Sequence, residues 1–331
     1  MMIKQTLNRM SQCVCMVAMF LAMVMPCLAQ NAESNEAGKS KQPGLLILSH
    51  GTPEPQWNEP VNTLVERVRK QNEDKETFHA IEGAFLEFTQ PDAAAGIEKL
   101  EAAGCDRIIV VPLFIAPSSH SLFDVPAVLG LYSSPEIRQT LEEEGARVAQ
   151  PRVPLTLTHT LSEGVLLDGF ARDEVRSLSK DPANEAVVLI AHGCRDHNSL
   201  VERMTRRIAT FCCGQCGIDY ADWAYCAVGQ TFWEEAEPVI ARAAEHKGRV
   251  LVVGLYVSSS AKRIYERAVK KVEGLMGTEF KSPFNEMDIV FSSKGLVDYP
   301  ATADWLLKTA RETLRGVPMV TQGNQGSVIQ R

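Results

Sequence analysis

The 331-residue sequence has few aromatic residues, no excess of positive charge and few cysteines. Lysine and arginine total 34 against 41 aspartate and glutamate residues, so a basic surface for nucleic acid is not expected. Nine cysteines in a chain of this length are too few for a disulfide scaffold. Hydrophobic residues at 45% and charged residues at 23% are ordinary globular values, which exclude a disordered or coiled-coil chain. The length favours two domains or one large α/β unit.

Several common catalytic motifs are also missing. The chain has no G-x-S-x-G sequence, which argues against an α/β-hydrolase. It has neither a P-loop nor a G-x-G-x-x-G, so no nucleotide is expected as a cofactor. A phosphate-transferring mutase would place an arginine before His50-Gly51, where this chain has Ser49.

The N-terminus has the three parts of an export signal. Lys4 and Arg9 precede an apolar run from Cys13 to Met25, and a small-x-small cleavage site ends at Ala29. The run is shorter than the roughly 20 residues of a spanning helix, which makes an uncleaved anchor the weaker alternative. We therefore expect a signal peptide over 1–29 and an exported, periplasmic protein without stable membrane insertion after cleavage. The remaining six cysteines would lie in an oxidising compartment.

The rest of the chain alternates apolar runs with amphipathic stretches. A polar linker over 30–43 precedes three runs, Leu45–Leu48, Ala80–Phe88 and Ile108–Ile115, of the kind that buried parallel strands produce. Helical patterns separate these runs, so an α/β fold with a parallel sheet is predicted.

The strand pattern repeats within the chain. Leu45–Thr52 (LLILSHGT) resembles Val187–Cys194 (VVLIAHGC), and Ile108–Ile115 (IIVVPLFI) resembles Val250–Val257 (VLVVGLYV). Both pairs are separated by the same offset in residue number, and the intervening stretches also align without a gap at that offset. We predict two duplicated parallel-sheet α/β domains that face each other across a central cleft. The predicted boundaries are 44–155 for the first copy, 156–183 for a connecting helix, 184–315 for the second copy and 316–331 for a flexible tail.

Three titratable side chains follow strands of the first copy. His50 follows the first strand, Glu87 closes the second, and His120 lies in the loop after the third. The carboxyl ends of parallel strands meet at one sheet edge, where ligands bind. Two imidazoles and a carboxylate suit a divalent ion such as Co²⁺, Fe²⁺, Ni²⁺ or Zn²⁺, and can also accept protons near neutral pH. From spacing alone, hydrogen-bonded structural histidines remain an equal alternative.

These residues carry a resemblance to a known family. The motifs are Leu48-Ser49-His50-Gly51-Thr52, Ala84-Phe85-Leu86-Glu87, Val111-Pro112-Leu113-Phe114 and Asp124-Val125-Pro126. Together they resemble the type II chelatases, most closely the CbiX-type sirohydrochlorin cobaltochelatases and ferrochelatases in their long, two-repeat form. The resemblance implies insertion of Co²⁺ or Fe²⁺ into a tetrapyrrole of cobalamin or siroheme biosynthesis without a nucleotide. The ligand chemistry also suits Ni²⁺. By this likeness, His50 and His120 are the metal-handling, catalytic histidines and Glu87 is the carboxylate that accompanies them.

One alternative class stays open. Because tetrapyrrole assembly is ordinarily cytoplasmic, an exported member could instead be a non-catalytic tetrapyrrole- or metal-binding protein. The complete set of His50, Glu87 and His120 argues for the enzyme. Two repeats in one chain supply both walls of a cleft, so we expect a monomer.

The second copy lacks most of the set. At the offset of the repeat, His120 corresponds to Lys262 and Glu87 to Gly229, beside Gln230, whereas His50 corresponds to His192. We interpret His192 as a remnant of the duplication and the second site as degenerate. Lys262 and Arg263 could pair with substrate carboxylates, or they could be the solvated start of a helix; the sequence favours neither.

A cysteine cluster lies at the end of a predicted helix. Cys212, Cys213 and Cys216 include a C-x-x-C spacing that zinc, an iron–sulfur cluster or a redox disulfide can use. A cluster needs about four thiolates. A local disulfide is the simplest interpretation for an exported protein.

Export makes a direct prediction. If residues 1–29 are removed, N-terminal sequencing of the protein from fractionated cells should read from Gln30 in the exported fraction. Intact Met1 on protein recovered from the cytoplasm would contradict the export hypothesis.

Overall fold

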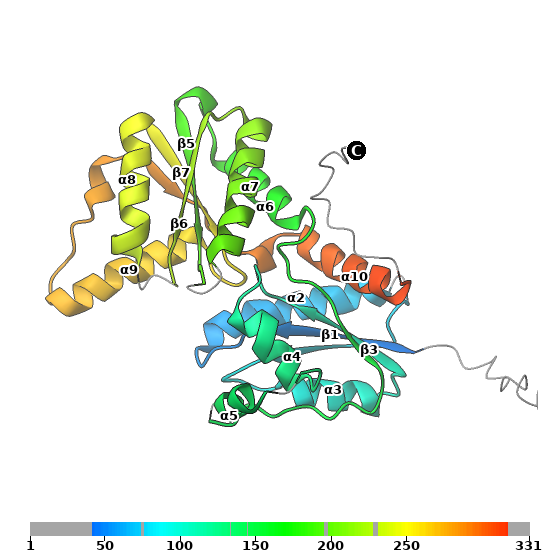
Figure 1. Ribbon diagram of the computed structural model, residues 1–331. Coiled ribbons are helices and arrows are strands. Elements are labelled where there is room, and N and C mark those ends of the chain that lie inside the picture. Colours follow the sequence, from blue (N-terminus) through cyan, green and yellow to red (C-terminus); the bar gives the residue numbers. More distant parts are fainter. Residues whose placement is uncertain are drawn as a thin grey trace, which may run out of the picture. The chain divides into compact units, whose positions relative to one another are not determined.

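A computed structural model describes residues 42–73, 76–132, 134–143, 145–194, 198–227 and 231–316. The predicted signal peptide therefore lies outside the described residues, as do nearly all of the predicted linker and tail. The described chain contains two four-stranded parallel sheets covered by helices (Figure 1). This is the predicted α/β class.

The first sheet has the strand order β2-β1-β3-β4. Its strands are β1 (Pro43–Ser49), β2 (Ala80–Phe85), β3 (Arg107–Pro112) and β4 (Leu155–Leu157). The intervening elements are α2 (Pro55–Glu73), α3 (Ala93–Ala102), the π-helical turn η1 (His120–Asp124), α4 (Val125–Val128) and α5 (Pro135–Glu143). Every residue of β1 is buried, because helices cover both faces of this central strand.

The second sheet repeats this order as β6-β5-β7-β8. Its strands are β5 (Glu185–Ala191), β6 (Tyr220–Tyr225), β7 (Arg249–Leu255) and β8 (Ile289–Phe291). The longer helices around it are α6 (Leu166–Leu178), α7 (Asn198–Cys216), α8 (Glu237–His246) and α9 (Ala261–Met276). The last helix, α10 (Ala301–Leu314), follows β8 in the chain. Both sheets thus have one topology.

The repeat contains a gap that the sequence comparison did not detect. The offset that aligns the starts of β1 and β3 with those of β5 and β7 would begin β6 at Asp222, whereas β6 begins earlier, at Tyr220. The backbone hydrogen bonds show the same shift. Leu86 N–H donates to the carbonyl oxygen of Ser49, and the corresponding Cys226 N–H donates to the carbonyl oxygen of Ala191. The prediction of an ungapped alignment was wrong. Ala227, rather than Gly229, stands at the level of Glu87, and Gly229 and Gln230 lie outside the described residues.

Two helices connect the sheets. α6, the predicted connecting helix, packs against α7 and β7 of the second sheet. α10, the last helix of the predicted second copy, returns to pack against α2 and β3 of the first sheet. One buried apolar cluster therefore runs continuously from Leu45 and Ile47 in β1 to Val187 and Leu189 in β5. Separate clusters lie on the opposite faces of the two sheets.

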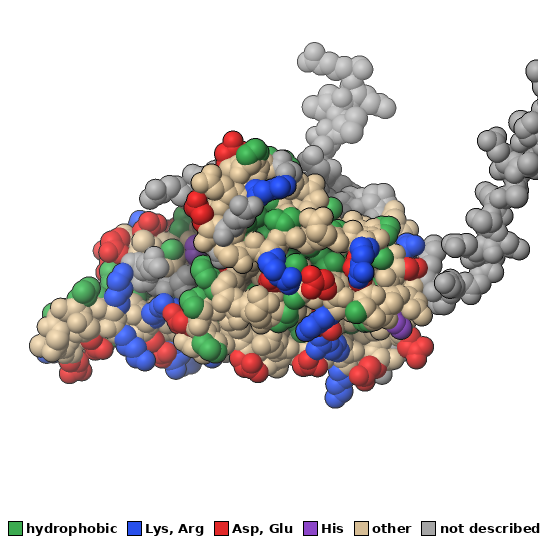
Figure 2. All heavy atoms as spheres, turned by 90° about the horizontal axis from the view of Figure 1, so that it is seen from below, with side chains coloured by type: hydrophobic (Ala, Val, Ile, Leu, Met, Phe, Trp, Pro, Cys, Tyr) green, Lys and Arg blue, Asp and Glu red, His purple; other side chains and the backbone are tan. Residues whose placement is uncertain are grey.

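The described surface carries charges of both signs. On the face drawn in Figure 2, the Lys and Arg side chains are interspersed with Asp and Glu side chains. No helix among the described residues has the length and apolar character needed to cross a bilayer.

The cysteine cluster differs from its prediction. Cys212, Cys213 and Cys216 are free thiols, so the expected disulfide is not formed in the described structure. The regular helix α7 carries Cys212 into the core, where burial raises the pKa of its thiol to about 12. The Cys216 thiol instead points to the carbonyl oxygen of Arg172, at 3.9 Å.

Candidate active site

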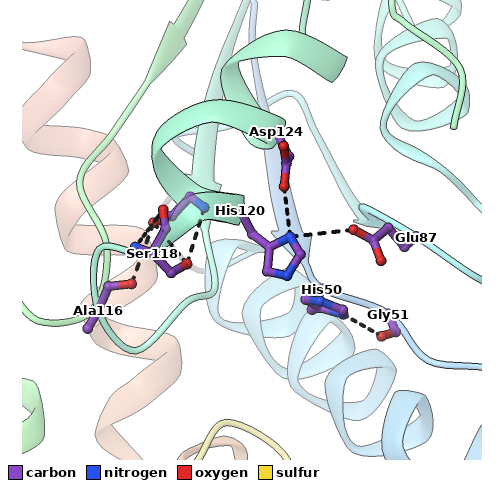
Figure 3. Close-up of polar contacts among 8 residues, drawn as sticks. His50, Gly51, Glu87, Ala116, Ser118, His120 and Asp124 are labelled. Carbon is purple, nitrogen blue, oxygen red and sulfur yellow. Dashed lines mark hydrogen bonds and ion pairs between the residues drawn. The ribbon is translucent and has the colours of Figure 1, made fainter. Parts of the chain in front are cut away.

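The structure brings His50, Glu87 and His120 together at the carboxyl edge of the first sheet. One possible ligand atom from each residue lies within 4.8 Å of the other two (Figure 3). The rings of His50 and His120 meet edge to face, with their centroids 4.6 Å apart. The predicted convergence of the three side chains is thus confirmed as geometry.

His50 is fixed by the sharp turn that follows β1. Its Nδ1 lies 2.8 Å from the Gly51 carbonyl oxygen and must donate to it, so the lone pair is on Nε2. Gly51 has φ +90°, and a Cβ there would lie 2.1 Å from the carbonyl oxygen of Glu87. Only glycine permits this approach. The turn also lets Glu87 N–H donate to the carbonyl oxygen of His50, at 2.9 Å.

His120 is positioned by η1, a π-helical turn. Its Nδ1 lies 2.8 Å from Asp124 Oδ2 and 3.5 Å from Glu87 Oε1. An Nδ1–H that donates to Asp124 leaves the lone pair on Nε2, as in the carboxylate–histidine pairs that orient metal ligands. Sequence reasoning quoted Asp124 in a motif but gave it no role. Its spacing of four residues from His120 on a helical turn was the available signal.

Glu87 is the buried member of the set, with 5% of its side chain exposed. Its Oε1 has no hydrogen-bond partner in the described structure. A buried carboxylate oxygen without a donor is costly, and a cation bound beside it would remove that cost. The donor set therefore fits a divalent cation on this observation alone.

The surroundings of His50 favour its neutral form. Burial lowers the pKa of His50 most strongly; the Gly51 hydrogen bond raises it, nearby His120 lowers it, Glu87 raises it and His192 lowers it, for a net fall below 6.5. A neutral imidazole can bind a metal ion or accept a proton, whereas its protonated form can do neither.

The second copy does not bring a comparable set of possible metal ligands together among its described residues. His192 repeats the turn of His50, since its Nδ1 donates to the Gly193 carbonyl oxygen at 2.9 Å. Ala227, at the level of Glu87, offers no ligand. Among the described residues, only His50, Glu87 and His120 form a group of three possible metal ligands.

Lys262 and Arg263 lie at the exposed start of α9. Lys262 Nζ is 4.0 Å from Glu266, and Arg263 Nη1 donates to the Ser258 carbonyl oxygen at 3.5 Å. One turn further on, Arg267 pairs with Glu54, at 3.2 Å, and lies over the Trp57 ring. Because Glu54 is four residues after His50, α9 faces the loop that leaves the candidate site.

Two parallel sheets, with a pair of imidazoles and a buried carboxylate at the carboxyl edge of one, define a metal-handling α/β protein. Comparison with known proteins gives the family. A family model described as CbiX matches residues 44–175, a segment that includes the three clustered side chains and ends before the second sheet. A sirohydrochlorin cobaltochelatase of Methanothermobacter thermautotrophicus is 32% identical over 104 residues, covering 31% of this chain and 68% of the relative. The chain belongs to the CbiX family of type II chelatases.

Other relatives define the extent of the likeness. A sirohydrochlorin cobaltochelatase of Methanococcus aeolicus is 33% identical over 92 residues, which cover 28% of this chain and 62% of the relative. The chain thus spans less than two thirds of that relative. The solved structure of SirB from Bacillus subtilis with Fe³⁺ has a TM-score of 0.60 at 17% identity and covers 85% of this chain and 99% of its own. That likeness concerns the fold and extends over both sheets.

The electrostatics of His50 predict its titration. In metal-free protein its pKa should lie below 6.5, and Glu87→Gln should lower it further by removing a negative charge. Because the folded-state pKa is below the unfolded value, the unfolded chain takes up this proton first as the pH falls. His50 therefore reduces stability progressively below about pH 6.5 and has no such effect above it. NMR titration of the imidazole resonances measures this, and a rise in pKa in Glu87→Gln would contradict the assignment.

Proposed function

We propose that this protein inserts a divalent metal ion, Co²⁺ or Fe²⁺, into sirohydrochlorin or a related tetrapyrrole without using a nucleotide. The observation that carries the proposal is the buried carboxylate of Glu87, whose Oε1 accepts no hydrogen bond, beside two imidazoles. Membership in the CbiX family supports the same reaction class. The donor set suits cobalt and iron alike, with nickel as a further candidate. The pathway would be of the cobalamin or siroheme type.

The three side chains divide the chemical work. Insertion exchanges two pyrrole N–H protons for one dication, so the site must hold the ion, strip its water and take up protons. In our proposal Nε2 of His50 and of His120 bind the incoming ion and then accept the released protons. Glu87 balances the positive charge and replaces water in the ion's coordination shell. Asp124 keeps His120 in the required tautomer through the bond to its Nδ1.

We propose that the chain acts as a monomer outside the cytoplasm. The two sheets of one chain provide two walls, and the composition of residues 1–29 supports export.

The assay for the function mixes purified protein with an excess of sirohydrochlorin and Co²⁺ and follows the absorbance spectrum against a protein-free control. Product well beyond one equivalent of protein is expected. Saturation at one equivalent would instead identify a non-catalytic tetrapyrrole- or metal-binding protein.

A comparison between the two sheets tests which one carries the site. His50→Ala should lower kcat by about 100-fold or more, because it removes a metal ligand and a proton acceptor together. His192→Ala is the matched control, since His192 has the same turn and the same Nδ1 hydrogen bond but no neighbouring carboxylate like Glu87. We expect its rate to change by less than about threefold. Equal losses in both variants, or a loss only in His192→Ala, would contradict the assignment of the active site to the first sheet.

We also propose that Lys262 and Arg263 bind carboxylates at the rim of the tetrapyrrole. Lys262→Ala should raise KM for sirohydrochlorin several-fold and leave kcat nearly unchanged, because an exposed ion pair contributes to binding and not to the chemical step. The control is Lys308→Ala, because Lys308 is also an exposed lysine and lies on α10. Steady-state kinetics at low and at high salt check the charge effect, and an unchanged KM at low salt would remove Lys262 from the site.

A further inference from the structure

Large apolar side chains are exposed beside the candidate metal ligands. Phe88, which directly follows Glu87, is 60% exposed, and Leu122 and Phe123 in the turn that begins with His120 are each 42% exposed. An exposed apolar side chain next to a polar centre is typical of ligand-binding surfaces.

Phe88 has an unfavourable backbone conformation. Its φ of +63° lies in the left-handed region, which a bulky residue enters only at a cost in free energy. Burial does not offset that cost, since more than half of the side chain is in solvent. A residue that strains the backbone and gains little from packing is explained more readily by binding than by stability.

The neighbours of Phe88 indicate what it binds. Its ring centroid is 6.2 Å from that of His50, so an occupant of its face is also next to the metal ligands. Phe88 further lines a cavity of about 180 Å³ together with Thr52, Asn62 and Thr89. That volume is below the roughly 300–1,000 Å³ of pockets that enclose whole ligands. The cavity is therefore too small to enclose a macrocycle and has room only for a substituent.

We propose that Phe88 is the residue against which the conjugated face of the tetrapyrrole packs. The proposal rests on the proposed function. A tetrapyrrole has an apolar face, a carboxylated edge and four nitrogens at its centre. Packing the face on Phe88 holds those nitrogens beside His50 and His120, while the carboxylates remain at the polar periphery. Phe88 thereby favours a flat conjugated macrocycle over ligands that have no flat apolar face.

The test separates macrocycle binding from metal binding and from folding. Sirohydrochlorin is titrated without metal into the wild-type protein and into Phe88→Ala, Phe88→Gly and Phe88→Tyr, and the absorbance change gives Kd. We expect Kd to rise about tenfold in the alanine and glycine variants and to return close to wild type in Phe88→Tyr. Calorimetric affinity for Co²⁺ alone should be unchanged. The unfolding midpoint of Phe88→Gly should equal or exceed that of wild type, because glycine relieves the strained φ.

Leu275→Ala is the matched control, since Leu275 is an 80% exposed apolar residue near the far end of α9. It should alter none of these quantities. Wild-type Kd in Phe88→Ala and Phe88→Gly would overturn the proposal, as would a loss of affinity that accompanies a lower unfolding midpoint or weaker Co²⁺ binding. If the wild-type protein binds sirohydrochlorin but does not metallate it, the proposed function fails while the titrations still decide the role of Phe88. If it binds no sirohydrochlorin, both fail.

Discussion

The buried carboxylate of Glu87 is the constraint around which the site is organised. A charge taken out of water needs compensation, and the backbone here supplies none to Oε1. The imidazoles that flank this oxygen are each tied through Nδ1 to another acceptor, Gly51 for His50 and Asp124 for His120. The Nε2 atom of each neutral imidazole therefore carries a lone pair, and neither ring offers the carboxylate a positive charge. In the proposed reaction, a metal ion bound by these nitrogens would balance the charge of the carboxylate.

The fold keeps this arrangement at one sheet and packs the two sheets on a shared core. α10 packs on β3 and α2 of the first sheet, and α6 packs on β7 and α7 of the second. The core is shared, so neither sheet can be removed as an independent unit. The second sheet has Ala227 at the level of Glu87 and therefore no carboxylate there. In the proposed reaction its contributions are structural support and a cationic helix start at Lys262, rather than a second metal site.

Much of the first sheet could be predicted from the sequence, because buried parallel strands appear as continuous apolar runs and their carboxyl ends must converge. That rule alone places His50, Glu87 and His120 together. Three features were beyond it. The packing of α6 on the second sheet and of α10 on the first depends on contacts between distant segments, which a helical pattern does not encode. The gap precedes β6, a strand without a continuous apolar run, so only the backbone register reveals it. Phe88 belongs to an apolar run, and nothing in the run distinguishes an exposed, strained residue from a buried one.

The central claim is that the metal ion is held by the first sheet alone. The most direct measurement is anomalous diffraction at the cobalt edge from crystals of the protein soaked with Co²⁺. The account predicts one strong peak within coordination distance of Glu87 Oε1 and of Nε2 on His50 and His120, and its disappearance in Glu87→Gln crystals. A principal peak at His192, or at the thiols of Cys212, Cys213 and Cys216, with none at Glu87, would contradict it.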